Sequence, residues 1–560
     1  MQKNLYSNQS TYTDNGFLSA NTFLLLVCIG IILNSFGLFN EILEPDGTLY
    51  ATISKHIAQT NDWVNLIGNG SDWLDKPHFP FWVTALSFKL FGYTAFAYKL
   101  PSFLFWLLGV YYTYQLALKL YNKKVAQLSV IIYITALHVI LSNFDVRAEG
   151  YLSALIIAAL YHIYCITQSK YSMHIIYAAI YCACAMMTKG IFVWVTIASG
   201  LIFYWIITKQ WKEFFQPKWY LFLALSFVFI LPELYCLYVQ FDMHPEKVVF
   251  GQTNVSGIKF FFWDSQFGRF FNNGPIKGKG DLSFFFHTLL WAFLPWCLFL
   301  YAAVIRYFTK RKTGNPERYF ITISALMTFL MFSLSKFQLP YYIVIVFPHF
   351  AMMTANWLAE RDSLKKLKGI NIIFIVLFFI LVALSLTIVI LLNAVNLILY
   401  CILLCITIAI FFITPKNIFE KAAWKSICFA FLLSAFLNVC LYPTIMNYQA
   451  GMHAGRWYNQ HQPLTQQVTL YRCVAQTSFT FYCNAPFNYT DTITEPDVNT
   501  VKPLIIYGNK TEIDSLPAKG FKVDVLQSFN YFHISELTGK FISSETRPSQ
   551  LSTFEIAGVR

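Results

Sequence analysis

The chain has 560 residues, of which 57% are hydrophobic and 12% are charged, and its mean hydropathy is +0.51. This composition excludes an ordinary soluble protein, whose core needs far less apolar sequence, and indicates a membrane protein with many spans. The net charge of +13 does not indicate a nucleic-acid partner, because the basic residues are dispersed among loops and form no patch.

Apolar stretches recur along the chain, and each is long enough to cross a bilayer as a helix, which takes about 20 residues. We predict about thirteen spans, near residues 20–39, 99–120, 125–142, 147–168, 172–188, 190–208, 218–240, 284–307, 319–335, 340–358, 370–392, 395–414 and 424–442. The first span follows a polar start with no cationic cap and no cleavage site, so we interpret it as a retained anchor.

Lysine and arginine gather in alternate loops, which gives the orientation by the positive-inside rule. If residues 1–19 are cytoplasmic, the cytoplasmic loops carry Lys119, Lys123, Lys124, Lys170, Lys209, Lys212, Lys218, Arg306, Lys310, Arg311, Lys312, Arg318, Arg361, Lys365, Lys366, Lys368, Lys416, Lys421 and Lys425. The segment 78–93 is too short for a span and has prolines at its start, so we expect it and Leu49–Ile57 to form helices on the membrane surface. The outer face then carries a long first loop at about 40–98 and a second at about 241–283.

After Tyr442 the apolar spans end, and short alternating runs separated by Asn, Pro, Gly and Asp begin, a pattern typical of β-strands. We expect strands at Gln467–Tyr471, Phe479–Tyr482, Leu504–Tyr507 and Lys522–Leu526. The predicted organisation is a cytoplasmic segment (1–19), an all-α membrane bundle (20–442) and a mixed α/β extracytoplasmic domain (443–560). Cys473 and Cys483 lie in this last domain, either as a disulfide or as two free thiols.

Charged residues gather at the predicted outer ends of the spans, where ionisable groups are costly unless they are paired or functional. They are Glu44, Asp46, Asp75, Lys76, Asp145, Arg147, Glu149, Lys189, Arg269 and Lys336. Carboxylates beside amines suit glycosyl transfer from a polyprenyl-phosphate sugar, in which a cation holds the lipid phosphate and a carboxylate accepts the proton of the attacking hydroxyl. The sequence has no glycine-rich nucleotide-binding motif, which agrees with such a donor.

Several short motifs occur in a characteristic order: Asp46-Gly47-Thr48-Leu49-Tyr50-Ala51, Asp75-Lys76-Pro77, Lys99-Leu100-Pro101-Ser102, Asp145-Val146-Arg147-Ala148-Glu149, Thr188-Lys189-Gly190, Leu294-Pro295-Trp296 and Ser335-Lys336-Phe337-Gln338-Leu339-Pro340-Tyr341-Tyr342. Over about residues 20–350 the chain thereby resembles the GT-C glycosyltransferases, in the branch that contains the aminoarabinose transferases acting on lipid A and the protein O-mannosyltransferases. The resemblance implies a bundle of transmembrane helices whose large first outer loop bears juxtamembrane helices. It also implies a polyprenyl-phosphate sugar donor and a location in the bacterial inner membrane, with the active site and the C-terminal domain on the periplasmic side.

The resemblance also implies roles for individual residues. Asp46 matches the principal catalytic carboxylate, and Glu149 matches the second acidic position, which is usually Asp. Lys76 and Arg269 match residues that contact the donor phosphate, and Tyr342 matches a tyrosine near the donor head group.

Two positions depart from the family pattern. Relatives often have Glu directly after the first Asp and Arg shortly before the Tyr, where this chain has Gly47 and Leu49. One phosphate contact is therefore expected to be missing or to come from Lys189 or Lys336. Asp75 stands where relatives can have a Glu associated with a metal, which leaves a divalent metal as an open alternative.

Structural readings of the same residues stay open at this point. Asp46 can cap the helix that follows it, and Lys76 and Lys189 can serve as membrane anchors. Glu149 can pair with Arg147 or Lys189, and Tyr342 can belong to an aromatic belt.

Functional alternatives also remain. A protein Ser/Thr acceptor is the nearest alternative to a glycolipid acceptor. Outside enzymes, a polytopic transporter or a membrane scaffold would use the same spans. Transporters tend to carry ionisable groups at the bilayer midplane and internal repeats, whereas here the charges gather at one boundary.

Overall fold

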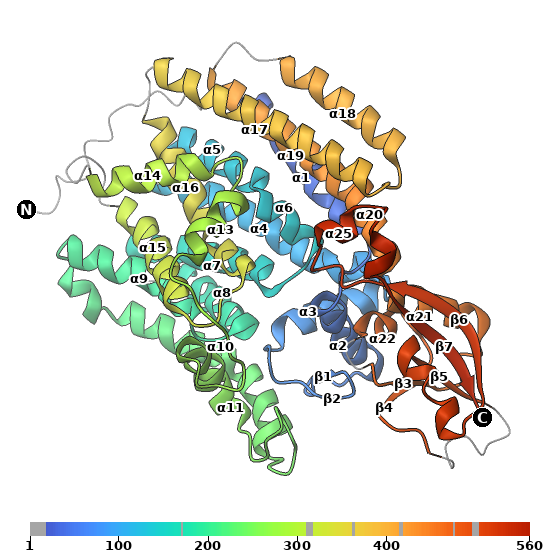
Figure 1. Ribbon diagram of the computed structural model, residues 1–560. Coiled ribbons are helices and arrows are strands. Elements are labelled where there is room, and N and C mark those ends of the chain that lie inside the picture. The colour runs from blue at the N-terminus through green and yellow to red at the C-terminus, as the bar shows by residue number, and fades with distance from the viewer. Residues whose placement is uncertain are drawn as a thin grey trace, which may run out of the picture.

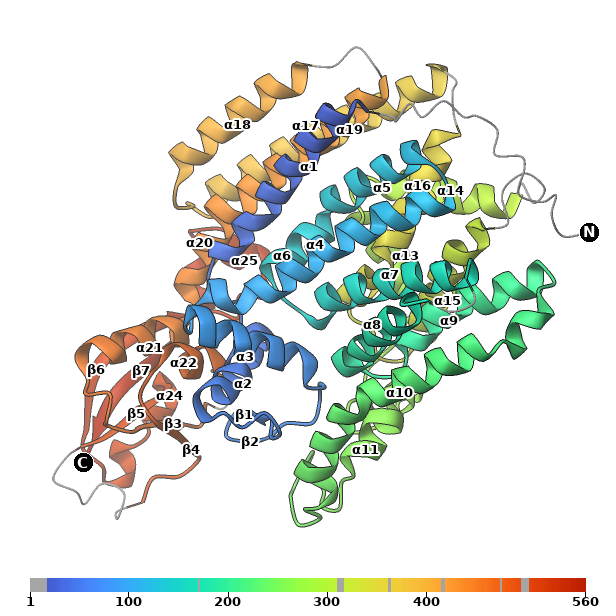
Figure 2. The same ribbon diagram turned by 180° about the vertical axis from the view of Figure 1, so that it is seen from behind.

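The computed structural model describes residues 18–169, 172–309, 317–360, 364–413, 418–473, 476–494 and 503–560. It has two parts, a large bundle of helices and a smaller α/β domain at the C-terminus that lies beside α2 and α3 (Figures 1 and 2). Most of the predicted N-terminal segment, together with the loop cations Lys170, Lys310, Arg311, Lys312, Arg361 and Lys416, lies outside the described residues.

The bundle contains one to three consecutive helical segments at each predicted span. They are α1 (Ala20–Ser35) with η1 (Phe36–Phe39), α4 (Ala95–Leu120), α5 (Lys123–Thr135) with α6 (Leu137–Phe144), α7 (Ala148–Thr167), α8 (His174–Lys189), α9 (Val193–Ile207), α10 (Pro217–Leu237) with η3 (Tyr238–Asp242), α13 (Phe284–Ala292) with α14 (Cys297–Thr309), α15 (Arg318–Leu334), η5 (Pro340–Val346) with α16 (Phe347–Ala359), α17 (Leu364–Leu391), α18 (Leu397–Phe412), and α19 (Ile418–Ala435) with η6 (Phe436–Leu441) and α20 (Tyr442–Ile445). Helices α1, α17, α18 and α19 form an outer layer of the bundle (Figure 2).

Six helices among the described residues are long and apolar enough to cross a membrane, or seven if the bent pair α5 and α6 is one span. Other apolar helices, among them α9, α14, α15 and α18, are shorter. The predicted count of about thirteen spans is therefore not confirmed, although the fold is a bundle of apolar helices as predicted.

Local capping explains where several helices begin. The side chains of Ser19, Thr94 and Asn122 accept hydrogen bonds from backbone N–H groups in the first turns of α1, α4 and α5. Such side-chain oxygens satisfy donors that have no partner within the helix. The first turns are thus fixed by residues that precede the apolar runs.

Two of the predicted spans are broken, and their breaks face each other. The chain leaves the helical conformation between α5 and α6 at Ala136, and between α13 and α14 near Pro295. The N–H of Leu137 donates to the carbonyl of Leu294 at 2.8 Å, and the indole of Trp296 donates to the Thr135 hydroxyl at 2.8 Å. Irregular backbone inside a bundle is tolerated where its polar groups find protein partners, and each break supplies partners for the other.

The first outer loop contains the two expected surface helices, α2 (Asp46–Thr60) and α3 (Phe79–Phe91), and a small hairpin, β1 (Ile67–Gly68) with β2 (Ser71–Asp72). Helix α2 ends where Asn61 takes a left-handed conformation. The second outer loop contains a continuous helical segment made of α11 (Gly257–Lys259), η4 (Phe260–Gly268) and α12 (Arg269–Phe271). Both loops therefore have helical structure of their own.

The C-terminal domain is a mixed α/β unit, as predicted. Its sheet has the order β4-β3-β5-β7-β6, in which β4, β3 and β5 are parallel and β7 is antiparallel to both of its neighbours. The strands are β3 (Val468–Tyr471), β4 (Phe487–Thr490), β5 (Leu504–Asn509), β6 (Val523–Tyr531) and β7 (Ser552–Val559), and the helices are α21 (Ala450–His461), α22 (Thr477–Tyr482), α24 (Lys510–Ile513) and α25 (Gly539–Ile542).

One expected strand is wrong. Phe479–Tyr482 belongs to the helix α22, because this short apolar run is buried between α21 and α2, and periodicity alone does not separate a buried strand from a buried helix over so few residues. Cys473 and Cys483 are both buried and both free, so the structure has two thiols here and no disulfide between them.

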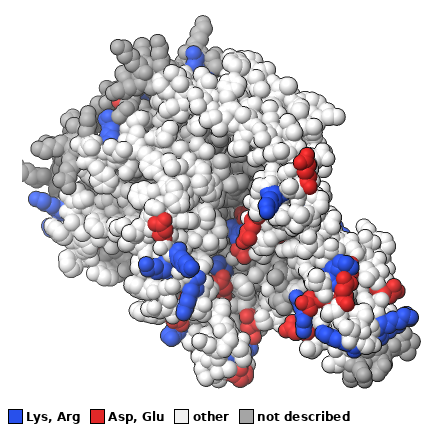
Figure 3. Space-filling model, viewed as in Figure 1, with Lys and Arg blue, Asp and Glu red and all other residues white. Residues whose placement is uncertain are grey.

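Charged side chains are unevenly distributed over the surface. In Figure 3 they gather around the hollow between the C-terminal domain and the α10 side of the bundle, whereas the upper part of the bundle shows few of them. Ionisable groups avoid a lipid-facing surface. This distribution agrees with a polar active side and an apolar belt.

Candidate active site

A cavity of about 400 Å³ lies between the two outer loops and the bundle. Charged and polar residues form one part of its wall: Asp75, Lys76, Lys189, Glu233, Ser265, Gln266, Arg269, Ser335 and Tyr342. Apolar residues form the larger part, among them Ile191, Phe192, Val195, Leu237, Phe260, Phe261, Phe270 and Phe332. A wall of this kind suits a ligand with an anionic group on an apolar chain.

Asp75 joins the two outer loops through ion pairs with two cations. Its Oδ2 lies 2.6 Å from Nζ of Lys76, and its Oδ1 pairs with the guanidinium of Arg269. Burial would raise the pKa of the Asp75 carboxyl, but the charges of Lys76 and Arg269 outweigh burial and lower this pKa to about 2. The carboxylate thus stays ionised at neutral pH and holds both cations at the cavity wall.

The metal suggested for Asp75 does not fit these surroundings. Both oxygens of this carboxylate contact cationic side chains, and among the described residues no group of three or more His, Cys, Asp or Glu side chains could hold a metal ion. A divalent cation would need several oxygen or nitrogen ligands at once.

Glu149, Lys189 and Tyr342 meet at the ends of different helical segments. The Glu149 side chain, in the first turn of α7, is only 2% exposed and pairs with Lys189 at the end of α8. Nζ of Lys189 also lies 3.5 Å from the centre of the Tyr342 ring in η5, a cation–π contact. The structure therefore brings these three predicted residues together, and it selects Lys189 as the partner of Glu149.

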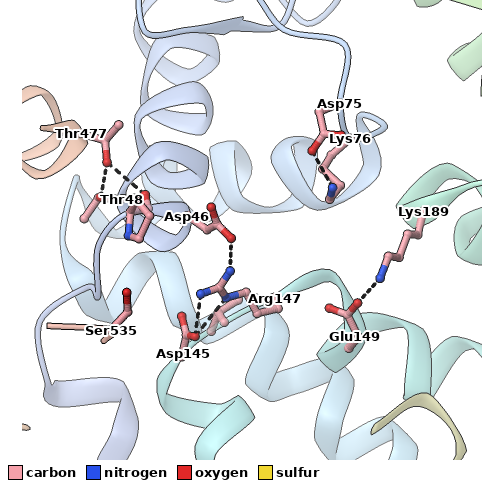
Figure 4. Close-up of polar contacts among 12 residues, drawn as sticks. Asp46, Thr48, Asp75, Lys76, Asp145, Arg147, Glu149, Lys189, Thr477 and Ser535 are labelled. Atoms are coloured by element: carbon pink, nitrogen blue, oxygen red, sulfur yellow. Dashed lines mark hydrogen bonds and ion pairs between the residues drawn. The ribbon is translucent and has the colours of Figure 1, made fainter. Parts of the chain in front are cut away.

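Asp46 is the first residue of α2 and pairs with Arg147 (Figure 4). The same guanidinium lies 2.9 Å from Asp145 and 5.0 Å from the ring centre of Tyr341. The Asp46 side chain is 38% exposed, more than the side chains of Asp75, Asp145 and Glu149. A held but accessible carboxylate can exchange a proton with an incoming group.

Lys76 connects the two halves of the site. Besides the large cavity it lines a small one of about 20 Å³ that Arg147 also lines. Lys76 therefore lies between the region of the Asp46–Arg147 pair and the large cavity that Arg269 lines.

Three predicted site residues do not line the large cavity: Asp46 and Glu149, which pair with Arg147 and Lys189 beside it, and Lys336. The Lys336 side chain is exposed and does not line the wall, although its backbone N–H donates to the carbonyl of Phe270. Of the two lysines expected to supply a missing phosphate contact, Lys189 therefore lines the cavity and Lys336 does not.

The surroundings of Gly47 and Leu49, the two positions that depart from the family pattern, do not favour the residues that relatives have there. A Cβ atom at residue 47 would lie only 3.0 Å from Cγ2 of Ile42, so a glutamate there would require Ile42 to shift, and it would lie 3.8 Å from Oδ1 of Asp145. Leu49 is buried in the apolar core and presents no cation.

Sequence reasoning missed Arg147 as the partner of Asp46, and it missed a buried pair made of His78 and Glu233. Oε1 of Glu233 lies 3.0 Å from Nδ1 of His78, its Oε2 accepts the backbone N–H of His78 at 3.1 Å, and Nε2 of His78 lies 2.9 Å from the carbonyl of Val64. Burial opposes the charge of the imidazole, but Glu233 outweighs it and raises the pKa of His78. The pair anchors the segment that carries Lys76 to α10, and an acidic residue within an apolar span was its sequence signal.

Glu233→Gln is expected to destabilise the protein by about 3 kcal/mol, because it leaves half of a buried ion pair. Since the pKa of His78 is raised in the folded state, its contribution is fully present below the ordinary histidine pKa of about 6.5 and is lost as the pH rises through the folded value. Thermal unfolding of both proteins across this pH range would measure the difference. Glu246→Gln, which removes the partner of the exposed His244, is the matched control and should change little.

Gly190 ends α8 directly after Lys189 and has φ of +103°, a conformation that L-residues rarely adopt. A Cβ atom here would also lie 2.2 Å from Nε2 of Gln266, which donates to the carbonyl of Lys189. This glycine therefore fixes the direction of the lysine that precedes it.

Gly190→Ala is expected to cost about 1–3 kcal/mol in backbone strain and to displace Gln266. We expect weaker binding of undecaprenyl phosphate together with a lower unfolding temperature, measured on the purified protein. Gly539→Ala, at a position where a Cβ meets no atom within 4 Å, should behave like the wild type. Equal binding by both variants would contradict the role of this turn.

Sequence comparisons identify relatives of this chain. The family model for dolichyl-phosphate-mannose-protein mannosyltransferases matches residues 75–236. An uncharacterised protein of Aquifex aeolicus is 25% identical over 91% of this chain and 95% of its own length. The undecaprenyl phosphate-α-4-amino-4-deoxy-L-arabinose arabinosyl transferase of Pectobacterium atrosepticum is 27% identical over 59% of this chain, and the match spans only 59% of that transferase.

The fold is shared along nearly the whole chain with a solved structure. The crystal structure of ArnT from Cupriavidus metallidurans bound to undecaprenyl phosphate superposes with a TM-score of 0.75, at 16% identity, over 96% of this chain and 98% of that chain. The apo structure of the same protein gives a TM-score of 0.73. The chain therefore has the GT-C fold, and the sequence matches support its resemblance to the branch of glycosyltransferases that contains the aminoarabinose transferases.

Proposed function

We propose that this chain transfers a sugar from a polyprenyl-phosphate donor to a lipid A-type glycolipid on the periplasmic side of the bacterial inner membrane. The observation that carries the proposal is the cavity of about 400 Å³, whose wall combines Lys76, Arg269 and Lys189 with a large apolar surface. An isoprenoid phosphate has the same two parts. The relatives named above support this donor.

The donor phosphate would lie against Lys76 and Arg269, with its isoprenoid chain along the aromatic wall. Asp75 holds these two cations in place, so their geometry is set before the donor binds. Lys189 is held in the same way by Glu149 and Tyr342. Preorganised cations of this kind stabilise charge that develops on a leaving group.

The chemical step would be a displacement at the anomeric carbon with inversion. The acceptor oxygen forms the new bond to this carbon while the bond from the carbon to the phosphate oxygen breaks. The acceptor proton passes to the Asp46 carboxylate, and the electron pair of the broken bond leaves with the lipid phosphate. Arg147 and Asp145 would keep Asp46 directed at the acceptor.

The proposed orientation is supported by the loop charges. Along the sequence the loops rich in lysine and arginine alternate with the two long loops, a distribution that the positive-inside rule associates with a cytoplasmic location of the basic loops.

Transfer by the purified full-length protein is the direct test. Undecaprenyl phosphate-4-amino-4-deoxy-L-arabinose labelled in the sugar would be supplied with lipid A or with a Ser/Thr-rich peptide. We expect labelled lipid A and release of undecaprenyl phosphate. Labelled peptide would instead assign a protein acceptor, and a donor left intact with both acceptors would contradict the proposed reaction with this sugar.

A further inference from the structure

The C-terminal domain contacts the outer loop at the residues that flank Asp46. The hydroxyl oxygens of Thr48 and Thr477 lie 2.6 Å apart, and the Thr477 hydroxyl also lies 3.0 Å from the carbonyl of Pro45, which accepts its hydrogen bond. Figure 4 shows Thr477 directed at this first turn of α2. A residue of α22 therefore touches the chain on both sides of Asp46.

A buried carboxylate holds the beginning of α22. Glu44, which is 6% exposed, accepts the backbone N–H of Ser478 at 3.1 Å. The backbone N–H of Glu44 donates to Oε1 of Gln449 at 3.1 Å. The Nε2 of Gln449 in turn donates to the carbonyl of Ile42 at 3.0 Å. Burial raises the pKa of Glu44 to about 7, although the bonds from Ser478 oppose this. Burial of a carboxyl group is costly unless it is hydrogen-bonded, and the Ser478 N–H supplies such a bond here.

A buried amine holds the end of the same helix. Lys55, which is 4% exposed, donates to the carbonyl oxygens of Phe481 at 2.7 Å and Cys483 at 2.8 Å. Burial lowers the pKa of this amine to about 8. Glu44 and Lys55 thus provide hydrogen-bond partners for backbone groups at the two ends of α22, where such groups have none within the helix. The segment that contains Asp46 therefore contacts α22 at both of its ends. We call Glu44, Thr48, Lys55 and Thr477 the α22 clamp.

None of the clamp residues lines the large cavity, so the clamp does not act on the donor phosphate. It acts on the first turn of α2, where Asp46 is the first helical residue and has an open side chain. A displacement of about 1 Å at a reacting group can cost about 10²-fold in rate. A fixed first turn of α2 is therefore expected to affect the rate of the chemical step more than the binding of the donor.

We propose that the C-terminal domain is a positioning element of the active site, in which the α22 clamp sets the direction of the Asp46 carboxylate. This inference rests on the proposed role of Asp46. It assigns the domain a part in the reaction without contact with the donor.

Thr477→Val removes one hydroxyl at constant shape, and Lys55→Met removes one buried amine. Both are expected to lower kcat by about tenfold or more and to leave the donor KM unchanged, because the cations of the cavity are not touched. Lys55→Arg, which keeps a cationic donor, should recover part of kcat. Lys522→Met, at an exposed position of the same domain, is the matched control.

Hydrogen–deuterium exchange in peptides that cover the first turn of α2 gives a reading independent of activity. We expect faster exchange there in Thr477→Val than in the wild type, with unchanged exchange in the strands β5 and β7. Unchanged exchange in that turn would overturn the inference, as would a folded Lys55→Met protein with wild-type kcat. A wild-type protein that transfers no sugar, but shows the expected exchange difference, would contradict the proposed function alone.

Discussion

Replacing Asp46 by asparagine is expected to lower kcat for sugar transfer by about 10²–10⁴-fold, the usual contribution of a general base. Asparagine has nearly the same shape and can still accept a hydrogen bond from Arg147, but it cannot take the proton of the acceptor. The donor KM should change little, because Lys76 and Arg269 keep their positions against Asp75. Steady-state kinetics with purified protein would separate the two constants.

Asp514→Asn is a suitable control for this change, since Asp514 is an exposed carboxylate of the C-terminal domain that pairs only with Lys510 in the described structure. Its kcat should equal that of the wild type. If Asp46→Asn retains full activity, Asp46 does not accept the proton, and Glu149 becomes the carboxylate to replace next.

The second large effect is expected for Lys76→Met, which keeps the aliphatic stem and removes the amine. We expect kcat/KM for the donor to fall by about 10²–10³-fold, because a preorganised cation would be lost from the leaving phosphate. Binding of undecaprenyl phosphate should weaken in parallel. Lys76→Arg should retain part of both, since a guanidinium also binds phosphate but has a different shape.

Lys247→Met tests whether any lysine of the outer loops has this effect. Lys247 lies 2.9 Å from Asp72 and does not line the cavity, so near wild-type kcat/KM is expected. Equal losses in Lys76→Met and Lys247→Met would assign the effect to general loop charge and would contradict a specific phosphate contact.

The elements that depend on local sequence were predictable. Hydropathy found the helices of the bundle, and turn residues separated β3, β5 and β6. Where local signals were ambiguous, prediction failed: Phe479–Tyr482 is helical because of what packs around it, and the break at Ala136 has no proline to announce it.

The site could be predicted in composition but not in pairing. The resemblance identified Asp46, Lys76, Glu149, Arg269 and Tyr342, which the structure brings to one region. Their partners depend on contacts between residues far apart in the chain, such as Arg147 with Asp46, which are 101 residues apart, or Arg269 with Asp75, which are 194 apart. A single sequence contains no signal for such pairs.

The ion pairs of the cavity wall also determine its electrical balance. Lys76, Arg269 and Lys189 pair with or lie beside Asp75 and Glu149, and Glu233 pairs with His78, so with that imidazole protonated the cluster has one positive charge in excess. A sugar phosphodiester carries one negative charge and would make the filled site neutral. The phosphate monoester left after transfer carries about −1.5 to −2 at neutral pH, so the same wall would hold a surplus negative charge. Because this extra negative charge is attracted to the same three cations, the spent lipid carrier is expected to compete with the donor for the site.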